Sequence, residues 1–397
     1  MNAGDDQGAI LLYTQALESG DLTDRGRMFF GDLLSKVGEA DQALEIWGSI
    51  SSSSEFKFNS LINRADVEKE LGNFSSAVEL LHQGLILFPG NSLARFNLGL
   101  LLMTFDPSQA LHEFEKVSDL PIELESKGFM LTRDLQEAIQ SDNLAYQLVI
   151  TGRSLAAIDE WELAYQAFRN STLNSPRYAE AWAWIGESAQ QTGKDPLPAL
   201  QRSLNLDPES ISSLAFTGLY YRKHGKPGLA WDYYEKAARL EPGNSTWQII
   251  LGELSAGKGD LAEALDYYQQ AVAISPDDLK ALRAMLDFSV YYQVYVDRVA
   301  LDAAIQILKL EPGSWESYDD MGQVMMASSN YNQALYYFER SIELDPDQAE
   351  SHFHLGLLFF LLDKDQDAYL ELEKASALAP GTAVSSQARE LLDQYFP

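Results

Sequence analysis

The sequence predicts an all-α fold in which two-helix hairpins are stacked into a solenoid, and three regularities lead to this prediction. Prolines recur at intervals of 32 to 36 residues, apolar residues between them follow helical spacing, and glycine and alanine return at fixed places in each interval. A fixed period of about 34 residues is typical of one copied unit that packs on its neighbours. The prolines are Pro176, Pro208, Pro242, Pro276, Pro312, Pro346 and Pro380.

The interval that ends at Pro242 defines the unit. Its first half has helical spacing, Gly225 then interrupts the chain, and its second half resumes the spacing up to the proline. We therefore expect a first helix, a turn and a second helix in each interval. The matching positions are Leu214, Gly218, Tyr221, Ala230, Tyr234 and Ala237 in this unit; Leu251, Gly252, Gly259, Ala264, Tyr268 and Ala271 in the next; and later Tyr318, Met321, Gly322, Met325, Ala334, Phe338 and Ser341, then Leu355, Gly356, Phe359, Ala368, Leu372 and Ala375.

One glycine recurs at the same place in the first helix of four units. Glycine within a helix costs about 0.5–1 kcal/mol relative to alanine, so its return in register indicates a close contact that a side chain would block. We expect the backbone at this position to be in contact with a neighbouring part of the fold. The glycines are Gly218, Gly252, Gly322 and Gly356.

This order of aromatic, leucine, glycine, alanine and proline positions resembles the tetratricopeptide repeat family. The resemblance is specific from Pro176 to Pro380 and loosens before it. It implies a right-handed superhelical solenoid with a long groove lined mainly by the first helices, and in this family that groove usually holds a peptide or a helix of a partner.

Departures from the repeat suggest four segments. We expect a divergent repeat block over residues 1–117 and a connecting helical segment over residues 118–142. A regular repeat block would cover residues 143–381, and a C-terminal capping helix residues 382–397. Residues 7–19 fit either the second helix of an incomplete unit or an ordinary leading helix, and a serine-rich loop at residues 49–54 replaces an expected proline.

Composition excludes several classes of function. Lys plus Arg is 29 and Asp plus Glu is 59, which gives a formal net charge of −30, so binding to nucleic acid or to anionic membranes is disfavoured. The chain has no cysteine and no apolar run long enough to span a bilayer. Met1 to Gln7 lack the pattern of a signal peptide. This slightly favours a cytoplasmic location, unless a leader was removed.

We expect no catalytic activity and no cofactor. The sequence has no His-Glu-x-x-His motif, no phosphate-binding glycine loop and no Gly-x-Ser-x-Gly motif. His352 and His354 are two residues apart on an expected helix, so they point to different faces and do not form a paired metal site.

The resemblance implies a set of groove residues on the first helices. Its basic members, Arg153, Arg222, Lys223, Lys280 and Arg283, predict an acidic or C-terminally carboxylated peptide as the partner. The alternative is that these are ordinary solvated charges. The carboxylate clamp of family members that bind chaperone tails is not found, because Asn63 and Asn97 lack the accompanying lysines. The predicted groove residues are Tyr146, Arg153, Glu187, Arg222, Lys223, Glu253, Lys280, Arg283, Asp287, Tyr291 and Asp319, accompanied by Glu180, Gln190, Glu316 and Gln323.

The leading functional hypothesis is a non-catalytic scaffold that binds a protein or peptide partner in the groove. One alternative is an array that self-associates, as a homodimer, through its terminal helices or residues 118–140. Another is an accessory region of a larger enzyme, such as the sugar transferases that carry similar arrays. Light scattering at several concentrations separates the first two, because a scaffold that awaits a partner stays monomeric.

Overall fold

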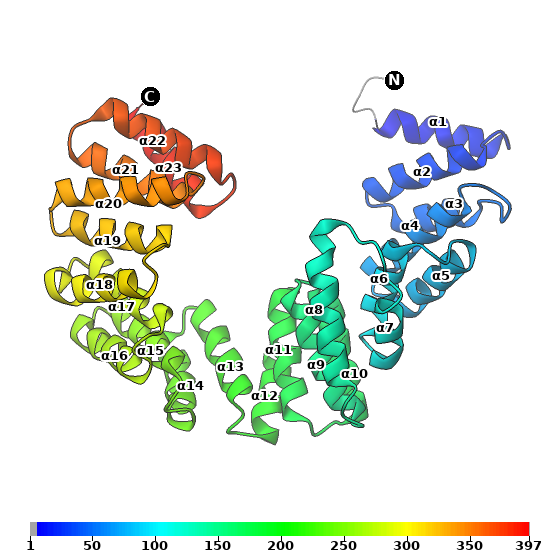
Figure 1. The fold of residues 1–397 in the computed structure, drawn as a ribbon. Coiled ribbons are helices and arrows are strands. Elements are labelled where there is room, and N and C mark those ends of the chain that lie inside the picture. Colours follow the sequence, from blue (N-terminus) through cyan, green and yellow to red (C-terminus); the bar gives the residue numbers. More distant parts are fainter. Residues whose placement is uncertain (1–5, 397) are drawn as a thin grey trace. The chain divides into compact units, whose positions relative to one another are not determined.

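The computed structural model describes residues 6–396 of the chain (Figure 1). These residues form helices and connecting turns, with no β-strand among them, which confirms the all-α prediction. The chain divides into two compact units, one ending at Tyr220 and the other beginning at Tyr221. Each unit is described separately below.

The N-terminal unit is a series of helices that pack on their sequence neighbours. It contains α1 (Asp6–Glu18), α2 (Asp24–Lys36), α3 (Ala40–Gly48), α4 (Lys57–Glu70), α5 (Phe74–Leu87), α6 (Ser92–Leu102), α7 (Pro107–Phe114), α8 (Ile122–Ala138), α9 (Leu144–Ala157), α10 (Trp161–Asn174), α11 (Ala179–Gln191), α12 (Leu197–Leu206) and most of α13 (Ile211–Lys223).

The C-terminal unit has the same construction and takes up the last turn of α13. It contains α14 (Pro227–Leu240), α15 (Ser245–Lys258), α16 (Leu261–Ile274), α17 (Leu279–Tyr291), the short π-helix η1 (Val296–Ala300), α18 (Leu301–Leu310), α19 (Trp315–Ala327), α20 (Tyr331–Leu344), α21 (Ala349–Leu361), α22 (Asp365–Leu378) and α23 (Ala383–Tyr395).

The periodic prolines mark the ends of second helices, as the sequence predicts. Pro242 lies two residues beyond the end of α14 at Leu240, and Pro276 lies two residues beyond the end of α16 at Ile274. Proline cannot donate a backbone hydrogen bond and does not continue a helix, so it fixes where each hairpin stops. The helices pair as hairpins, with α15 on α16, α19 on α20 and α21 on α22 among the closest pairs.

The recurring glycines lie at close contacts between the two helices of a hairpin, as their repeated position predicts. A Cβ atom at Gly322 would lie 2.5 Å from ring carbons of Phe338, and a Cβ atom at Gly152 would lie 2.5 Å from the ring of Phe168. Both rings are fully buried. The glycine backbone therefore packs closely against a large side chain of the second helix, and at Gly356 a Cβ atom would also lie 3.2 Å from the backbone nitrogen of Leu372.

The longest proline interval, from Pro276 to Pro312, is accommodated at a turn. Between α17 and α18 the backbone has positive φ at Gln293 (54°) and Tyr295 (56°), and η1 follows. A π-helix takes up additional residues within a helical segment. The repeat therefore keeps its hairpin while its turn is lengthened.

Two helices that fall outside the repeat pattern also pack on their neighbours. Helix α8, within the expected connecting segment, lies against α7 and α9 and buries Leu131, Leu135 and Ala138. Helix α23 packs on α22 and buries Ala388. Among the described residues, no helix has the length and apolar character needed to cross a membrane. The first five residues, on which part of the signal-peptide expectation rests, lie outside the described region.

Candidate functional site

The first helices of the C-terminal unit form one face. Helices α15, α17, α19 and α21 contact one another in this order, and we call this side of the unit the first-helix face. A cavity of about 760 Å³ opens between α15 and α17. Its lining is Thr246, Ile249, Ile250, Glu253, Ala256, Tyr268, Lys280, Arg283, Ala284, Asp287, Phe288, Tyr291 and Tyr292. The structure thus brings together the predicted residues Glu253, Lys280, Arg283, Asp287 and Tyr291.

Aromatic rings form one wall of this cavity. Tyr268 of α16 is buried, and its ring centroid lies 5.0 Å from that of Phe288. Tyr292 contacts Phe288 at 5.5 Å and Tyr291 at 4.9 Å between ring centroids. Tyr291 is 80% exposed, although an aromatic ring gains from burial. The aromatic wall therefore has packed rings, Tyr268 and Phe288, at its base and the solvent-exposed ring of Tyr291 at its edge.

Arg283 is held by carboxylates of the protein itself. Its Nε donates to Asp320 Oδ2 at 2.9 Å, and its terminal nitrogens lie 3.1 Å from Glu316 Oε2 and 3.3 Å from Glu311 Oε2. Burial raises the pKa of Asp320 to about 6, against the opposing effect of Arg283. The guanidinium charge is thus largely compensated within the fold.

Beyond Arg283, α19 and α21 carry a buried acid and a histidine. Asp319 is 4% exposed, accepts from Gln323 Nε2 at 3.0 Å, and lies 2.8 Å from Nδ1 of His354. Burial opposes the charged imidazole, but the charge of Asp319 and the hydrogen bond to it raise the pKa of His354. Asp319 was predicted as a groove residue; it is instead buried and already paired.

The remaining basic residues of the predicted set differ in their contacts. Arg222, at the end of α13, pairs with Glu253 at 2.9 Å, and both side chains are substantially exposed. Lys223 and Lys280 are exposed. Both arginines predicted in this unit therefore face carboxylates of the same chain, which weakens the argument for an acidic partner.

Three predicted residues belong to the N-terminal unit. Tyr146 and Arg153 are exposed on α9, and the guanidinium carbon of Arg153 lies 5.5 Å from the ring centroid of Trp184. Arg153 and Trp184 line a second cavity of about 580 Å³ together with residues of α8. Glu187 on α11 is 6% exposed and accepts from both Gln190 and Gln191. Glu187 is thus a buried acid rather than a surface group.

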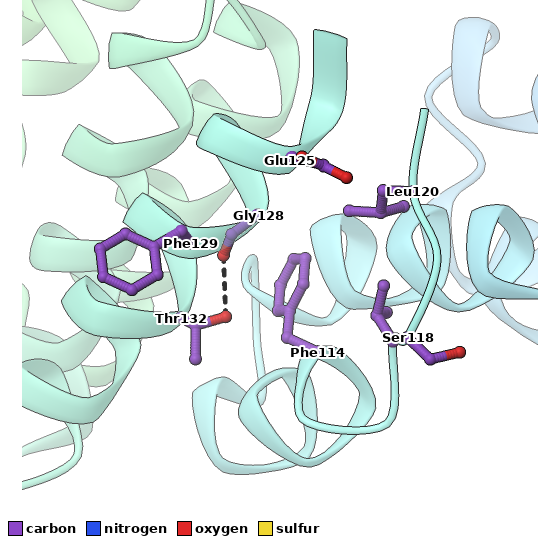
Figure 2. A pocket seen from close by; sticks show the side chains of 8 residues that line it. Phe114, Ser118, Leu120, Glu125, Gly128, Phe129 and Thr132 are labelled. Carbon is purple, nitrogen blue, oxygen red and sulfur yellow. Dashed lines mark hydrogen bonds between the residues drawn. The ribbon is translucent and has the colours of Figure 1, made fainter. Parts of the chain in front are cut away.

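A smaller hollow of about 310 Å³ lies between the end of α7 and α8. Figure 2 shows Phe114, Ser118 and Leu120 on one side and Gly128, Phe129 and Thr132 on α8, where Thr132 Oγ1 donates to the Gly128 carbonyl at 2.8 Å. Phe129 is 76% exposed. The repeat pattern does not predict this hollow, because α8 lies outside the repeat register.

Part of the C-terminal site is likewise not predicted by the repeat pattern. Ile249 and Ile250 line the cavity. In the sequence they resemble ordinary core residues of a helix, so nothing distinguishes them as binding residues. Asp320 was missed because its neighbour Asp319 matched the groove position. The one available signal was the pair of adjacent aspartates, Asp319 and Asp320, in the middle of a helix.

The two closely spaced histidines contact different helices, as their spacing predicts. His352 lies near Glu371 of α22, whereas His354 lies near Asp319 of α19. In the described part of the chain, no three histidine or acidic side chains are arranged to hold a metal ion.

Comparisons with known proteins match the repeat. Family profiles described as "Tetratricopeptide repeat" and "TPR repeat" match residues 62–105 and 217–278, and residues 322–363, respectively. A solved structure of a tetratricopeptide repeat protein from Parabacteroides merdae is similar with a TM-score of 0.49 and 13% identity, over 62% of this chain and 98% of that one.

Two characterised proteins are similar to parts of the chain. The human mitochondrial import receptor subunit TOM70 is 24% identical over 185 residues, 44% of this chain and 30% of that protein. The BBSome complex member BBS4 homolog of Drosophila melanogaster is 22% identical over 319 residues, 79% of this chain and 63% of that protein. The alignments thus span less than two thirds of either relative.

One of these relatives is described as a receptor subunit and the other as a member of a complex. Profile matches fall in both units of the chain, and the hairpins α15–α16 and α19–α20 have the glycine contacts expected of the repeat. The chain thus contains tetratricopeptide repeats over the residues that the profiles match.

Proposed function

We propose that this chain is a non-catalytic binding protein that holds a segment of a protein partner on the first-helix face of its C-terminal unit. The observation that carries the proposal is the cavity between α15 and α17, with Tyr291 standing 80% exposed at its aromatic wall. A concave, partly apolar site with a few polar groups is the usual form of a binding site.

Solvent exposure of Tyr291 supports this assignment. Because little of the Tyr291 ring is buried within the chain, the ring is free to bury its surface against a partner. Tyrosine is also enriched at protein–protein interfaces. Ile249 and Ile250 add aliphatic surface on the facing helix. Together they provide an anchor point for a side chain of the incoming segment.

Site-specific photo-crosslinking tests the proposal. A photoreactive phenylalanine analogue replaces Tyr291 in one full-length variant and Tyr336 in another. Tyr336 is the matched control, because it is 61% exposed on α20, a second helix. We expect position 291 to crosslink a discrete protein from extracts of the source cells, and position 336 to crosslink none.

Other outcomes are decisive as well. Equal capture at both positions would place the interaction elsewhere and contradict the proposal. Crosslinks only between copies of the chain would support the self-associating alternative. An acidic partner is not part of this proposal, since Arg222 and Arg283 already contact carboxylates.

A further inference from the structure

One carboxylate in the cavity between α15 and α17 has no hydrogen-bond donor of its own. Asp287 lines the cavity and is exposed, and within residues 6–396 it accepts no hydrogen bond. Arg283 stands one helical turn earlier on α17, but its nitrogens are directed to Asp320, Glu311 and Glu316. Asp287 therefore lines the cavity as a carboxylate to which no group of residues 6–396 donates a hydrogen bond.

Its surroundings disfavour the charge that it carries. Although Asp287 reaches solvent, the neighbouring helices partly desolvate its carboxylate and raise the pKa of Asp287; Arg283 and His354 partly oppose this effect, and Asp319 adds to it. A carboxylate in such a hollow gains more from a cation than a carboxylate on a convex surface does. The missing element is thus a positive group that enters from outside.

This inference rests on the proposed function and specifies its partner. We propose that the bound segment presents a lysine or arginine whose charged group pairs with Asp287 and whose aliphatic stem lies against Tyr291 and Tyr292. Aromatic faces attract cations, and long basic side chains pack their stems on apolar surface. The cavity supplies both features on adjacent turns of α17 and its C-terminal end.

The other charges near the cavity agree with a basic partner. Glu253 is shared with Arg222 across an exposed pair, and Arg283 is surrounded by acids. Lys280 is seven residues before Asp287 on α17, roughly 10 Å along the helix axis, and is exposed. The chain as a whole carries −30, which steers cationic segments toward it.

Peptide display on the full chain tests the inference. A random 12-residue peptide library is selected against the wild-type protein, Asp287→Asn and Asp266→Asn. Asp266 is the matched control, because it is an exposed aspartate on α16 that does not line the cavity. We expect wild type and Asp266→Asn to select sequences with lysine or arginine next to an apolar residue, and Asp287→Asn to lose that preference.

Affinity and stability are then measured for one selected peptide. Asp287→Asn should weaken its binding about tenfold, since one partner of a charge pair is removed, and should leave the thermal midpoint no lower than that of wild type, because it removes a disfavoured charge. Tyr291→Ala should weaken binding as well. Asp266→Asn should leave binding unchanged.

The outcomes separate this inference from the proposed function. Selection of acidic sequences, or equal basic selection by Asp287→Asn and wild type, would overturn the inference while peptide binding by the face stands. If the library yields no enriched sequence on any variant, the proposed function fails and the inference fails with it.

Discussion

Nδ1 of His354 on α21 lies 2.8 Å from Oδ2 of Asp319 on α19, which joins two consecutive first helices of the C-terminal unit. The raised pKa of His354 means that the folded chain holds the imidazole proton more tightly than the unfolded chain does. The stability from this pair is fully present below the ordinary histidine value of 6.5 and is lost as pH rises through the folded value.

The first prediction is therefore that stability falls as pH rises from 6 to 8. His352 acts in the same direction, because its hydrogen bond with Glu371 raises the pKa of His352. The pKa of Asp320 is raised to about 6, so ionisation of Asp320 also lowers stability as pH rises, but most of that loss of stability has occurred by pH 6. Thermal midpoints at pH 6, 7 and 8 check the trend. His354→Gln should show a smaller decrease, and a wild-type midpoint that rises over this range would refute the assignment.

The second prediction concerns the two arginines that the sequence assigned to recognition. Arg283→Met leaves Asp320 buried without its cation and should cost on the order of 3 kcal/mol. Arg222→Met breaks an exposed pair with Glu253 and should cost about 0–1 kcal/mol. Chemical denaturation of both variants measures the difference.

A double variant supplies the control for this prediction. Arg283→Met combined with Asp320→Asn removes both charges and should recover part of the lost stability. If Arg283→Met is as stable as Arg222→Met, Arg283 does not have the structural role that its contacts indicate.

Repeat spacing predicts the hairpins well because each helix packs only on its near neighbours. Pro242 and Pro276 fall where second helices end, and Gly322 falls against Phe338. These local rules repeat in register, so the sequence contains them several times over. The helical architecture is therefore accessible without coordinates.

The ion pairs of the site cannot be predicted from the repeat spacing in the same way. The sequence places Arg283 and Asp287 one turn apart on a helix, which favours pairing between them. The structure instead directs Arg283 to Asp320 on α19, because adjacent first helices bring that acid to the guanidinium. Which partner an ion chooses depends on packing between repeats, and this information lies beyond one period.

The third prediction compares two glycines of the C-terminal unit. Gly322→Ala places a Cβ atom 2.5 Å from the buried ring of Phe338 and should cost roughly 1–3 kcal/mol through overpacking. Gly257→Ala, on α15, meets nothing within 4 Å and should stabilise by about 0.5 kcal/mol through helix propensity. Unfolding midpoints check both signs, and equal shifts would refute the close contact at Gly322.

The fourth prediction concerns α23, which we propose caps the last hairpin. Ala388 is fully buried and packs in one cluster with Phe353, Leu372 and Ala375. Ala388→Asp places an unpaired charge in that cluster, which is costly in an apolar environment, so α23 should detach. Gln387→Asp is the control, because Gln387 is exposed on the same helix. In Ala388→Asp alone, hydrogen exchange should become fast in α23 and should also accelerate in α22. Helices α15 to α18 should stay protected, because each hairpin depends mainly on its neighbours. Uniformly faster exchange along the whole C-terminal unit would show instead that the unit opens as one cooperative block.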